Sequence, residues 1–307
     1  MAAISQILFG FVASIATSVQ KAIFGYGSPS GSVYTAITNL VSNTGVVSTD
    51  TAGVGTARTD IAAASYGGDK AIFGYGFGSS GNLSITNLVS NTGVITTEVY
   101  GVGTARNALA AAGYGTDKAI FGYGFNGSTN VSITNKVGNT GAVVADTAGV
   151  GTARSGLAAA GYGSDKAIFG YGYTTVNVSM TNLVSNTGVV ATDTTGVGTA
   201  RNSLAAAGYG TDKAIFGYGS TGSVTAITNL VSNTGVVSTD TTGVGTARYG
   251  LAAAGYGTDK AIFGYGYIGY ARASETNLVS NTGVVATDTS GVGTARVNLA
   301  AAGYSLS

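Results

Sequence analysis

Six near-copies of one unit of about 47 residues fill almost the whole chain. The phrase Lys-Ala-Ile-Phe-Gly-Tyr-Gly opens the copies at Lys21, Lys70, Lys118, Lys166, Lys213 and Lys260. Each copy continues through Asn-Thr-Gly and Gly-Val-Gly-Thr-Ala-Arg, and it ends on Leu-Ala-Ala-Ala-Gly-Tyr or a close variant. A fixed period of this length is typical of propellers and solenoids, in which each unit buries its apolar face against the next. The copies must therefore be interpreted as one architecture.

Composition argues against several classes of function. The chain has no cysteine and no histidine, which removes thiolate chemistry, Ser-His-Asp triads and Cys/His metal sites. It has 14 Lys and Arg against 13 Asp and Glu, without the basic stripe that nucleic-acid binding needs. No apolar run of about 18 residues is present, so we expect no membrane insertion. We also expect no enzyme activity, no cofactor and no metal.

The fifth unit illustrates the strands expected in every copy. The small apolar run 203–209 suits an inner strand close to an axis, and residues 213–218 predict a strand buried on both faces. The alternating run 224–232 predicts a half-exposed strand, and the polar run 236–241 predicts an outermost strand after the Asn-Thr-Gly turn. Four strands graded from apolar to polar favour a propeller blade. A parallel β-helix is the alternative, although its coils are usually shorter than this unit.

The run from Arg201 to Gly219 resembles a kelch repeat. It reads Arg-Asn-Ser-Leu-Ala-Ala-Ala-Gly-Tyr-Gly-Thr-Asp-Lys-Ala-Ile-Phe-Gly-Tyr-Gly, so that an Arg precedes a small strand, an Asp-Lys step follows and glycines end the next strand. The likeness covers residues 21–304, but Tyr218 splits the paired glycines and the family's Trp is missing. The resemblance implies a four-stranded blade and carries no kelch-specific function.

The phrase Ile-Phe-Gly-Tyr-Gly is also similar to repeats in structural proteins of bacteriophages, cyanophages especially. That resemblance implies a virion protein, with an extracellular location as the alternative. The partners it implies are other virion or surface proteins, or a host surface glycan.

We expect an all-β chain with one β-propeller domain over residues 21–307, made of six four-stranded blades. Residues 298–304 would pair with residues 21–27 and close the ring. Residues 1–20 partly imitate the repeat, through Ile-Leu-Phe-Gly-Phe at 7–11, and would act as a clasp or docking strand. Seven blades, with a partial blade made from the termini, are the alternative. A cleaved signal peptide is the other reading of this apolar segment, although it lacks a basic start.

Nearly every charge occupies a repeated position, which indicates packing rather than a site. Each unit carries an Asp or Glu eight residues before an arginine. We expect each arginine to pair with a carboxylate or with backbone carbonyls of a neighbouring blade, because its fork geometry fixes such contacts. An anion site at one mouth of the channel is the functional alternative. The arginines are Arg58, Arg106, Arg154, Arg201, Arg248 and Arg296.

Positions that differ between the copies are the candidates for function. One variable segment follows the second strand and another follows the arginine, and in a four-stranded blade both emerge on the same face. Aromatic rings beside Asn, Ser and Thr suit a sugar or a protein partner, whereas covering blade edges is the structural alternative. The candidate binding residues are Phe77, Tyr100, Phe125, Tyr173, Tyr249, Tyr267, Tyr270, Arg272, Asn107 and Asn202.

The sequence thus favours a non-enzymatic structural or binding protein. The leading hypothesis is a phage virion or appendage component that recognises a protein or glycan through the variable loops. A secreted bacterial lectin-like adhesion module is the first alternative. A purely architectural decoration or filament subunit is the second.

Overall fold

A computed structural model describes residues 19–306, and all regular secondary structure in this range is β-strand. Six antiparallel sheets of three strands make up the fold, together with one short hairpin, β5 (Phe77–Gly78) and β6 (Gly81–Asn82). The prediction of an all-β chain is confirmed. Within the described range, no helix is long and apolar enough to cross a membrane.

Each sheet uses the repeat in the same order, from an inner strand through a middle strand to a third strand. The inner strands are β3 (Ala62–Tyr66), β8 (Ala110–Tyr114), β11 (Ala158–Tyr162), β14 (Ala205–Tyr209), β17 (Ala252–Tyr256) and β20 (Ala300–Leu306). The middle strands are β1 (Val19–Gly25), β4 (Lys70–Gly74), β9 (Lys118–Gly122), β12 (Lys166–Tyr173), β15 (Lys213–Gly217) and β18 (Lys260–Tyr267). The third strands are β2 (Thr38–Val41), β7 (Thr86–Val89), β10 (Thr134–Val137), β13 (Asn177–Val184), β16 (Thr228–Val231) and β19 (Arg272–Val279).

The middle strand is the core of each sheet because both of its faces are covered. In β9, Ile120 packs against the sheet that follows along the chain, whereas Phe121 packs against the sheet that precedes it. Alternation along a strand places these two neighbours on opposite faces. Both side chains are fully buried. Burial of each contributes about 1.5–3 kcal/mol to stability.

Neighbouring sheets meet through an aromatic pair. The rings of Tyr123 and Phe169 lie with their centroids 5.2 Å apart at 62°, an edge-to-face arrangement. Phe169 approaches so closely that a Cβ at Gly122 would lie 2.8 Å from its Cζ. The pair recurs at every junction, as Tyr26–Phe73, Tyr75–Phe121, Tyr123–Phe169, Tyr171–Phe216, Tyr218–Phe263 and Tyr265–Phe24.

The expected fourth strand is not formed, so the prediction of four-stranded sheets is wrong. The outer segments (46–51, 94–99, 142–147, 189–194, 236–241 and 284–289) touch the third strands only at isolated bridges. In the fourth unit these bridges join Val184 to Val190 and Thr181 to Thr194, so the register shifts between them. The buried side chain of Asn182 lies between the bridges and donates to the carbonyl oxygen of Ala191 at 3.0 Å. The hydrogen bond from the Asn182 side chain thus replaces part of the backbone hydrogen-bond ladder between the third strand and the outer segment.

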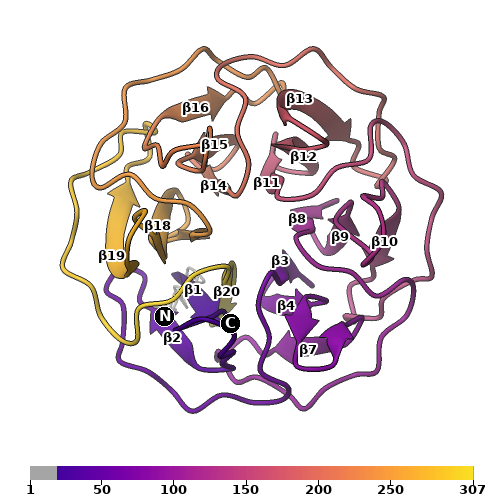
Figure 1. The fold of residues 1–307 in the computed structure, drawn as a ribbon, viewed down its shortest axis with the longest axis horizontal. Helices are drawn as coiled ribbons and strands as arrows, with labels where there is room; N and C mark the ends of the chain where they lie inside the picture. The colour runs from indigo at the N-terminus through magenta and orange to yellow at the C-terminus, as the bar shows by residue number, and fades with distance from the viewer. Residues whose placement is uncertain (1–18, 307) are drawn as a thin grey trace, which may run out of the picture.

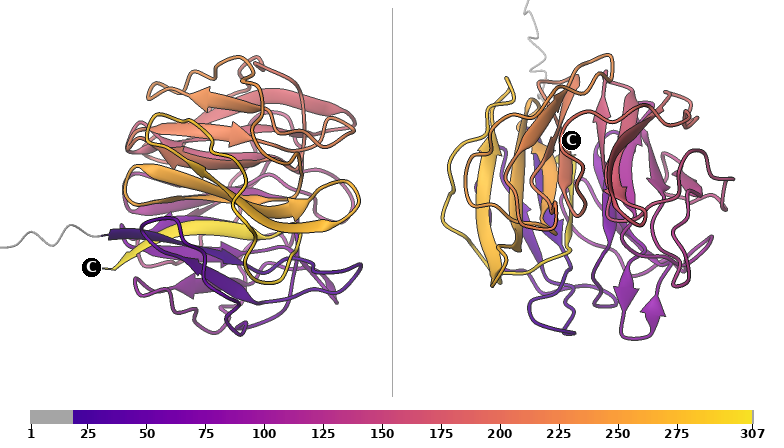
Figure 2. Two further views of the ribbon diagram at one scale, coloured as in Figure 1. Left: turned by 90° about the vertical axis from the view of Figure 1, so that its left-hand side faces the viewer. Right: turned by 45° about the horizontal axis from the view of Figure 1, so that its top comes forward.

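The six sheets are arranged around a common centre, with the inner strands facing it (Figure 1). Each inner strand contacts the inner strands of both neighbouring sheets, and β20 contacts β3. The first sheet contains both ends of the described chain, because β1 pairs with β20 from Val19 opposite Leu306 to Gly25 opposite Ala300. This pairing is the one expected from the terminal repeats. Figure 2 shows the two strand ends leaving the same side of the ring.

The N-terminal expectations lie almost wholly outside the described residues. A partial seventh blade and a signal peptide both depend on residues 1–18. Of the segment 1–20, only Val19 and Gln20 are described, and both belong to β1.

Two cycles of backbone hydrogen bonds connect neighbouring sheets around the ring. The first cycle lies on the side of the ring where the turns before the lysines are, here called the lysine face. Its donor–acceptor distances are 2.7–3.0 Å. These donor–acceptor pairs are Gly67–Asp117, Gly115–Asp165, Gly163–Asp212, Gly210–Asp259, Gly257–Gln20 and Ser305–Asp69. The second cycle lies at the opposite end of the inner strands. There the backbone N–H of the second residue after each arginine donates to the carbonyl oxygen of the equivalent residue in the preceding unit, at 2.6–2.9 Å. This second cycle, the plug ring, contains Asp60, Ala108, Gly156, Ser203, Gly250 and Asn298.

Candidate functional site

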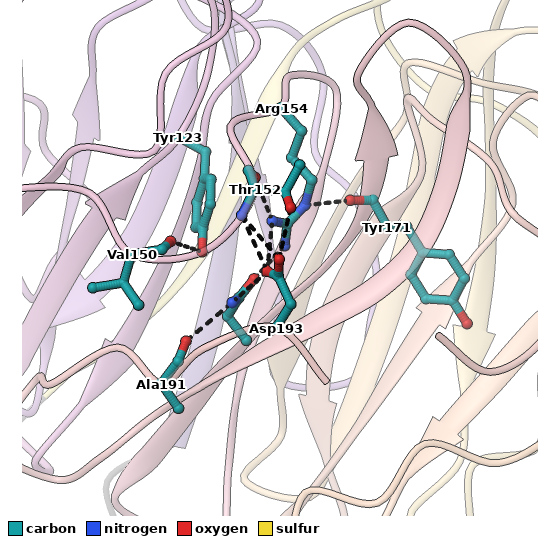
Figure 3. Close-up of polar contacts among 8 residues, drawn as sticks. Tyr123, Val150, Thr152, Arg154, Tyr171, Ala191 and Asp193 are labelled. Atoms are coloured by element: carbon teal, nitrogen blue, oxygen red, sulfur yellow. Dashed lines mark hydrogen bonds and ion pairs between the residues drawn. The ribbon is translucent and has the colours of Figure 1, made fainter. Parts of the chain in front are cut away.

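Arg154 joins two neighbouring sheets from a fully buried position. Its Nε donates to the carbonyl oxygen of Tyr171 at 2.8 Å, and its Nη2 donates to Oδ1 of Asn182 at 2.7 Å. Its Nη1 donates to the carbonyl oxygen of Thr152 at 3.0 Å (Figure 3). The guanidinium carbon lies 4.3 Å from the ring centroid of Tyr123, in the preceding sheet. Only the planar fork of arginine combines this stacking with three directed hydrogen bonds.

Asp193 completes this network from the outer segment. It accepts hydrogen bonds from the hydroxyl of Thr152 at 2.7 Å and from Nδ2 of Asn182 at 2.9 Å. Burial works to raise the pKa of Asp193, but these hydrogen bonds together bring the pKa below its usual value. Oδ1 of Asp193 is 4.0 Å from Nη1 of Arg154. The Asp193 carboxylate therefore stabilises mainly the turn at Thr152. The hydrogen bonds donated by Arg154 are accepted by neutral oxygens.

The same arrangement recurs at all six junctions. Every arginine is fully buried and lies 4.2–4.6 Å from a tyrosine ring of the preceding sheet. Burial lowers the pKa of each arginine, and the stacked tyrosine opposes that effect. Arg248 differs in that its Nε is buried without a hydrogen-bond partner. These guanidinium groups do not face solvent, so they hold sheets together instead of lining an anion site.

The two variable segments are hydrogen-bonded to each other. Asn107 and Phe125, for example, exchange backbone hydrogen bonds of 3.0 and 2.9 Å. Both segments therefore lie on one side of the ring, here called the variable face and opposite to the lysine face. The six bridged pairs are Val297–Ser28, Thr59–Phe77, Asn107–Phe125, Ser155–Tyr173, Asn202–Ser220 and Tyr249–Tyr267.

Aromatic side chains gather on the variable face in the sixth unit. The rings of the bridged residues Tyr249 and Tyr267 lie 5.4 Å apart, and Tyr270, three residues on, is 83% exposed. In the fourth unit Tyr173 is 43% exposed. Phe77 and Phe125 are half-buried, and Phe77 packs edge-to-face against Tyr34. Phe77 thus covers part of the surface, as the structural alternative expected.

Predicted polar residues of this face take part in contacts between sheets. Nδ2 of Asn107 donates to Oδ1 of Asn82 at 2.7 Å, and Nδ2 of Asn82 donates to the carbonyl oxygen of Phe125 at 3.2 Å. Asn202 donates to Asn177 in the same way at 2.6 Å. The sequence analysis did not select Asn82 or Asn177, although their recurrence at one repeat position was the available signal.

Two other candidates differ from the rest of the set. Arg272 donates through Nε to the carbonyl oxygen of Ser28 at 2.8 Å, and so connects the sixth and first units. Tyr100 is 88% exposed but follows the outer segment of the second unit, apart from the bridged pairs. The structure therefore brings Tyr249, Tyr267 and Tyr270 together on one unit and leaves Tyr100 separate.

Asp60 is a site residue that sequence reasoning did not assign. It belongs to the plug ring, whose six members all have φ between 49° and 61°. Burial raises the pKa of Asp60 to about 6. No other member of the ring can ionise, so this carboxyl is the only titratable group in the cycle.

Comparison with known proteins does not supply a function. No family model matches the sequence, and no match is found among curated proteins. Over residues 19–306, there is no group of three or more potential metal-ligating side chains.

Proposed function

We propose that the six sheets form a six-bladed β-propeller and that the protein is a non-enzymatic binding protein. Its variable face recognises a protein or a glycan. The architecture is supported by the two hydrogen-bond cycles and by the sheet that both termini share. Each blade has three strands and an irregular outer segment.

One observation carries the binding proposal, namely the aromatic group formed by Tyr249, Tyr267 and Tyr270. A bridged pair of tyrosines holds two of the rings in place, and the third stands almost fully in solvent. Rigid rings lose little entropy on binding, and their faces suit sugars as well as apolar protein surfaces. The repeated framework below them is stabilised by buried contacts that recur from unit to unit, the arginine–tyrosine stacking among them.

A non-enzymatic role follows from how the ionisable groups are used. Histidine and cysteine are absent, and the repeated arginines and aspartates take part in contacts that join the sheets. A catalytic site needs a group with a shifted pKa beside a place for a substrate. Asp60 has the shift, but the cavity it lines contains no other ionisable residue.

A place on a virion or appendage is supported by the resemblance to phage repeat proteins, and secretion as an adhesion module is the alternative. Mass spectrometry of density-purified particles and of particle-free culture medium would separate the two. Detection at fixed stoichiometry in particles supports the virion. Detection only in the medium supports secretion.

The binding proposal is tested with a Tyr267→Ala/Tyr270→Ala variant on glycan arrays and in pull-downs from host surface extracts. We expect the variant to lose at least about tenfold in affinity, because each aromatic anchor commonly contributes more than 1 kcal/mol. Tyr100→Ala is the matched control, since it removes an exposed tyrosine outside the bridged pairs. Equal binding by all three proteins would exclude the aromatic group as the recognition site.

A purely architectural role is the second candidate, and a ring of exposed valines favours it. Val46, Val94, Val189, Val236 and Val284 follow the Asn-Thr-Gly turns and are 61–67% exposed. Repetition in five of the six units suits a partner that is itself ring-shaped. This role would be favoured if replacement of these valines prevented incorporation of the protein into particles. The Tyr267→Ala/Tyr270→Ala variant should then be incorporated normally.

A further inference from the structure

The lysine face encloses a cavity of about 320 Å³ around the centre of the ring. Its wall includes Gly113, whereas Leu109, four residues earlier, lines a separate cavity of about 80 Å³ at the plug ring. The two cavities share no lining residue. On this side of the inner strand, side chains become smaller toward the lysine face, in the order leucine, alanine, glycine. This decrease in size leaves a space along the axis that opens at the lysine face.

Most units have glycine in this wall, where the inner strands approach one another closely, and the second unit has Ser65. A Cβ at Gly161 would lie 3.3 Å from the carbonyl oxygen of Gly113 in the neighbouring strand. The same spacing recurs at Gly208 and Gly255. Side chains at these positions would meet the neighbouring strand and fill part of the cavity.

The charges around this cavity are arranged unequally. Its lining includes four lysines, Lys118, Lys166, Lys213 and Lys260, and no carboxylate. Each of these lysines also bonds the aspartate before it at 2.7–3.1 Å, but those aspartates lie outside the lining. An ammonium group has three donors, so a lysine that bonds one carboxylate keeps donors for a second anion.

The first unit shifts the local charge balance further. Gln20 stands where the other units have an aspartate, and it lines the cavity. The face therefore has six repeated lysines and five such aspartates.

The turns that precede the four cavity lysines contain non-glycine residues with positive φ. Thr116, Ser164, Thr211 and Thr258 line the cavity with φ between 67° and 74°. β-branched residues rarely adopt positive φ, and glycine would fit such a turn without strain, as Gly68 does in the second unit. Strained residues of this kind cluster at functional sites. These four residues line the same cavity as the four lysines.

We propose that this lysine cavity binds one small oxyanion with several negative charges, such as a short chain of phosphates or a polycarboxylate. The ammonium groups surround the ligand from several blades. Their side chains are 44–45% exposed, so added salt should weaken the binding. The hydroxyls supply polar neighbours of the right kind for phosphate or carboxylate oxygens. This site lies on the face opposite to the tyrosines and does not depend on the proposed function.

The test uses inorganic tripolyphosphate and isothermal titration calorimetry on the full chain in about 0.15 M salt. We expect saturable binding with one site per chain, and weaker binding of inorganic phosphate. The variant Lys118→Gln/Lys213→Gln removes two ammonium groups of the cavity and should bind roughly tenfold or more weakly. As a matched pair of single variants, Lys136→Gln removes a positive charge outside the cavity and should bind as the unmodified protein does, whereas Lys118→Gln should bind more weakly.

Three results would overturn the proposal. The first is an absence of saturable binding in the unmodified protein. The second is equal weakening by Lys136→Gln and by Lys118→Gln, which would indicate attraction by net charge alone. The third is a stoichiometry above one, which would indicate independent surface lysines. Circular dichroism of every variant checks that each retains the fold.

Discussion

The guanidinium carbon of Arg154 lies 4.3 Å from the ring centroid of Tyr123 in one sheet, while its Nε donates to the carbonyl oxygen of Tyr171 in the next. One buried side chain thereby sets the spacing of two sheets. In a ring, an error in spacing at one junction would displace every later junction. Repetition of the same connector six times keeps the geometry uniform.

Replacement of Arg154 by Lys should destabilise the protein although the charge is kept. An ammonium group cannot stack on Tyr123 and also donate along three fixed directions, so buried acceptors lose their partner. We expect a loss of about 2–4 kcal/mol in the free energy of unfolding, measured by urea denaturation. The control Lys136→Gln, a half-buried lysine with one hydrogen bond to the carbonyl oxygen of Thr187, should change stability by less than about 1 kcal/mol. A similar small change for Arg154→Lys would contradict a structural role.

The contact between Gly122 and Phe169 predicts a coupled pair of substitutions. Gly122→Ala places a methyl group 2.8 Å from Cζ of Phe169 and should cost about 1–3 kcal/mol. Phe169→Leu removes that ring atom, so the double variant should lose clearly less stability than the sum of the two single variants. Strict additivity in this double-mutant cycle would show that the two positions do not meet.

Asp60 predicts a pH dependence of stability with a definite sign. Its pKa in the folded protein is raised to about 6, whereas an unfolded chain has a value of about 3.9. Between these values the folded state binds the proton more tightly, so the contribution of Asp60 to stability falls as pH rises from about 4 to 6. At pH 7 the carboxylate is charged in a half-buried place.

The variant Asp60→Asn removes this dependence. Asn298 occupies the equivalent position in the first unit at φ 55°, so asparagine fits the conformation. We expect the variant to match the unmodified protein near pH 4 and to exceed its stability by about 1–2 kcal/mol at pH 7. Thermal denaturation at both pH values measures the difference. A difference that is constant with pH would rule out titration of Asp60 as the cause.

Removal of residues 300–307 should abolish cooperative folding. The deletion takes away β20, which pairs with β1 over seven residues and contacts the inner strands β17 and β3. The edge of β1 would then expose unpaired backbone groups. Circular dichroism melting and size-exclusion chromatography should show a broad transition and aggregation, whereas removal of Ser307 alone should have no effect. A sharp transition in the longer deletion would mean that the other sheets fold without the closing strand.

The repeat predicted much of this fold because its strands have distinct compositions. Apolar Ile215 and Phe216 between alanine and glycine indicate a strand covered on both faces, and both side chains are fully buried. The missing outer strand could not be predicted in the same way. Its run 236–241 has suitable residues, and only the tertiary position of Asn229 and its bonds to Ser238 and Asp240 explain why the ladder is interrupted.

The candidate site was harder to predict for a related reason. The six members of the plug ring share a backbone conformation and no side-chain chemistry, since aspartate, alanine, glycine, serine and asparagine all occur there. A comparison of residue types cannot detect such a position. The lysines were visible as a repeated pattern, but only the structure shows that four of them line one cavity.

The pairing of Val19 with Leu306 determines how the protein would respond to a pulling force. Both strands leave the sheet at this pair, so a load applied through the two ends acts on one hydrogen bond after another, from the outermost pair inward. Bonds opened in sequence yield at lower force than bonds sheared together. An attachment through both ends would therefore open the ring at its first sheet, while an attachment through one end and a face would load the closed ring as a whole.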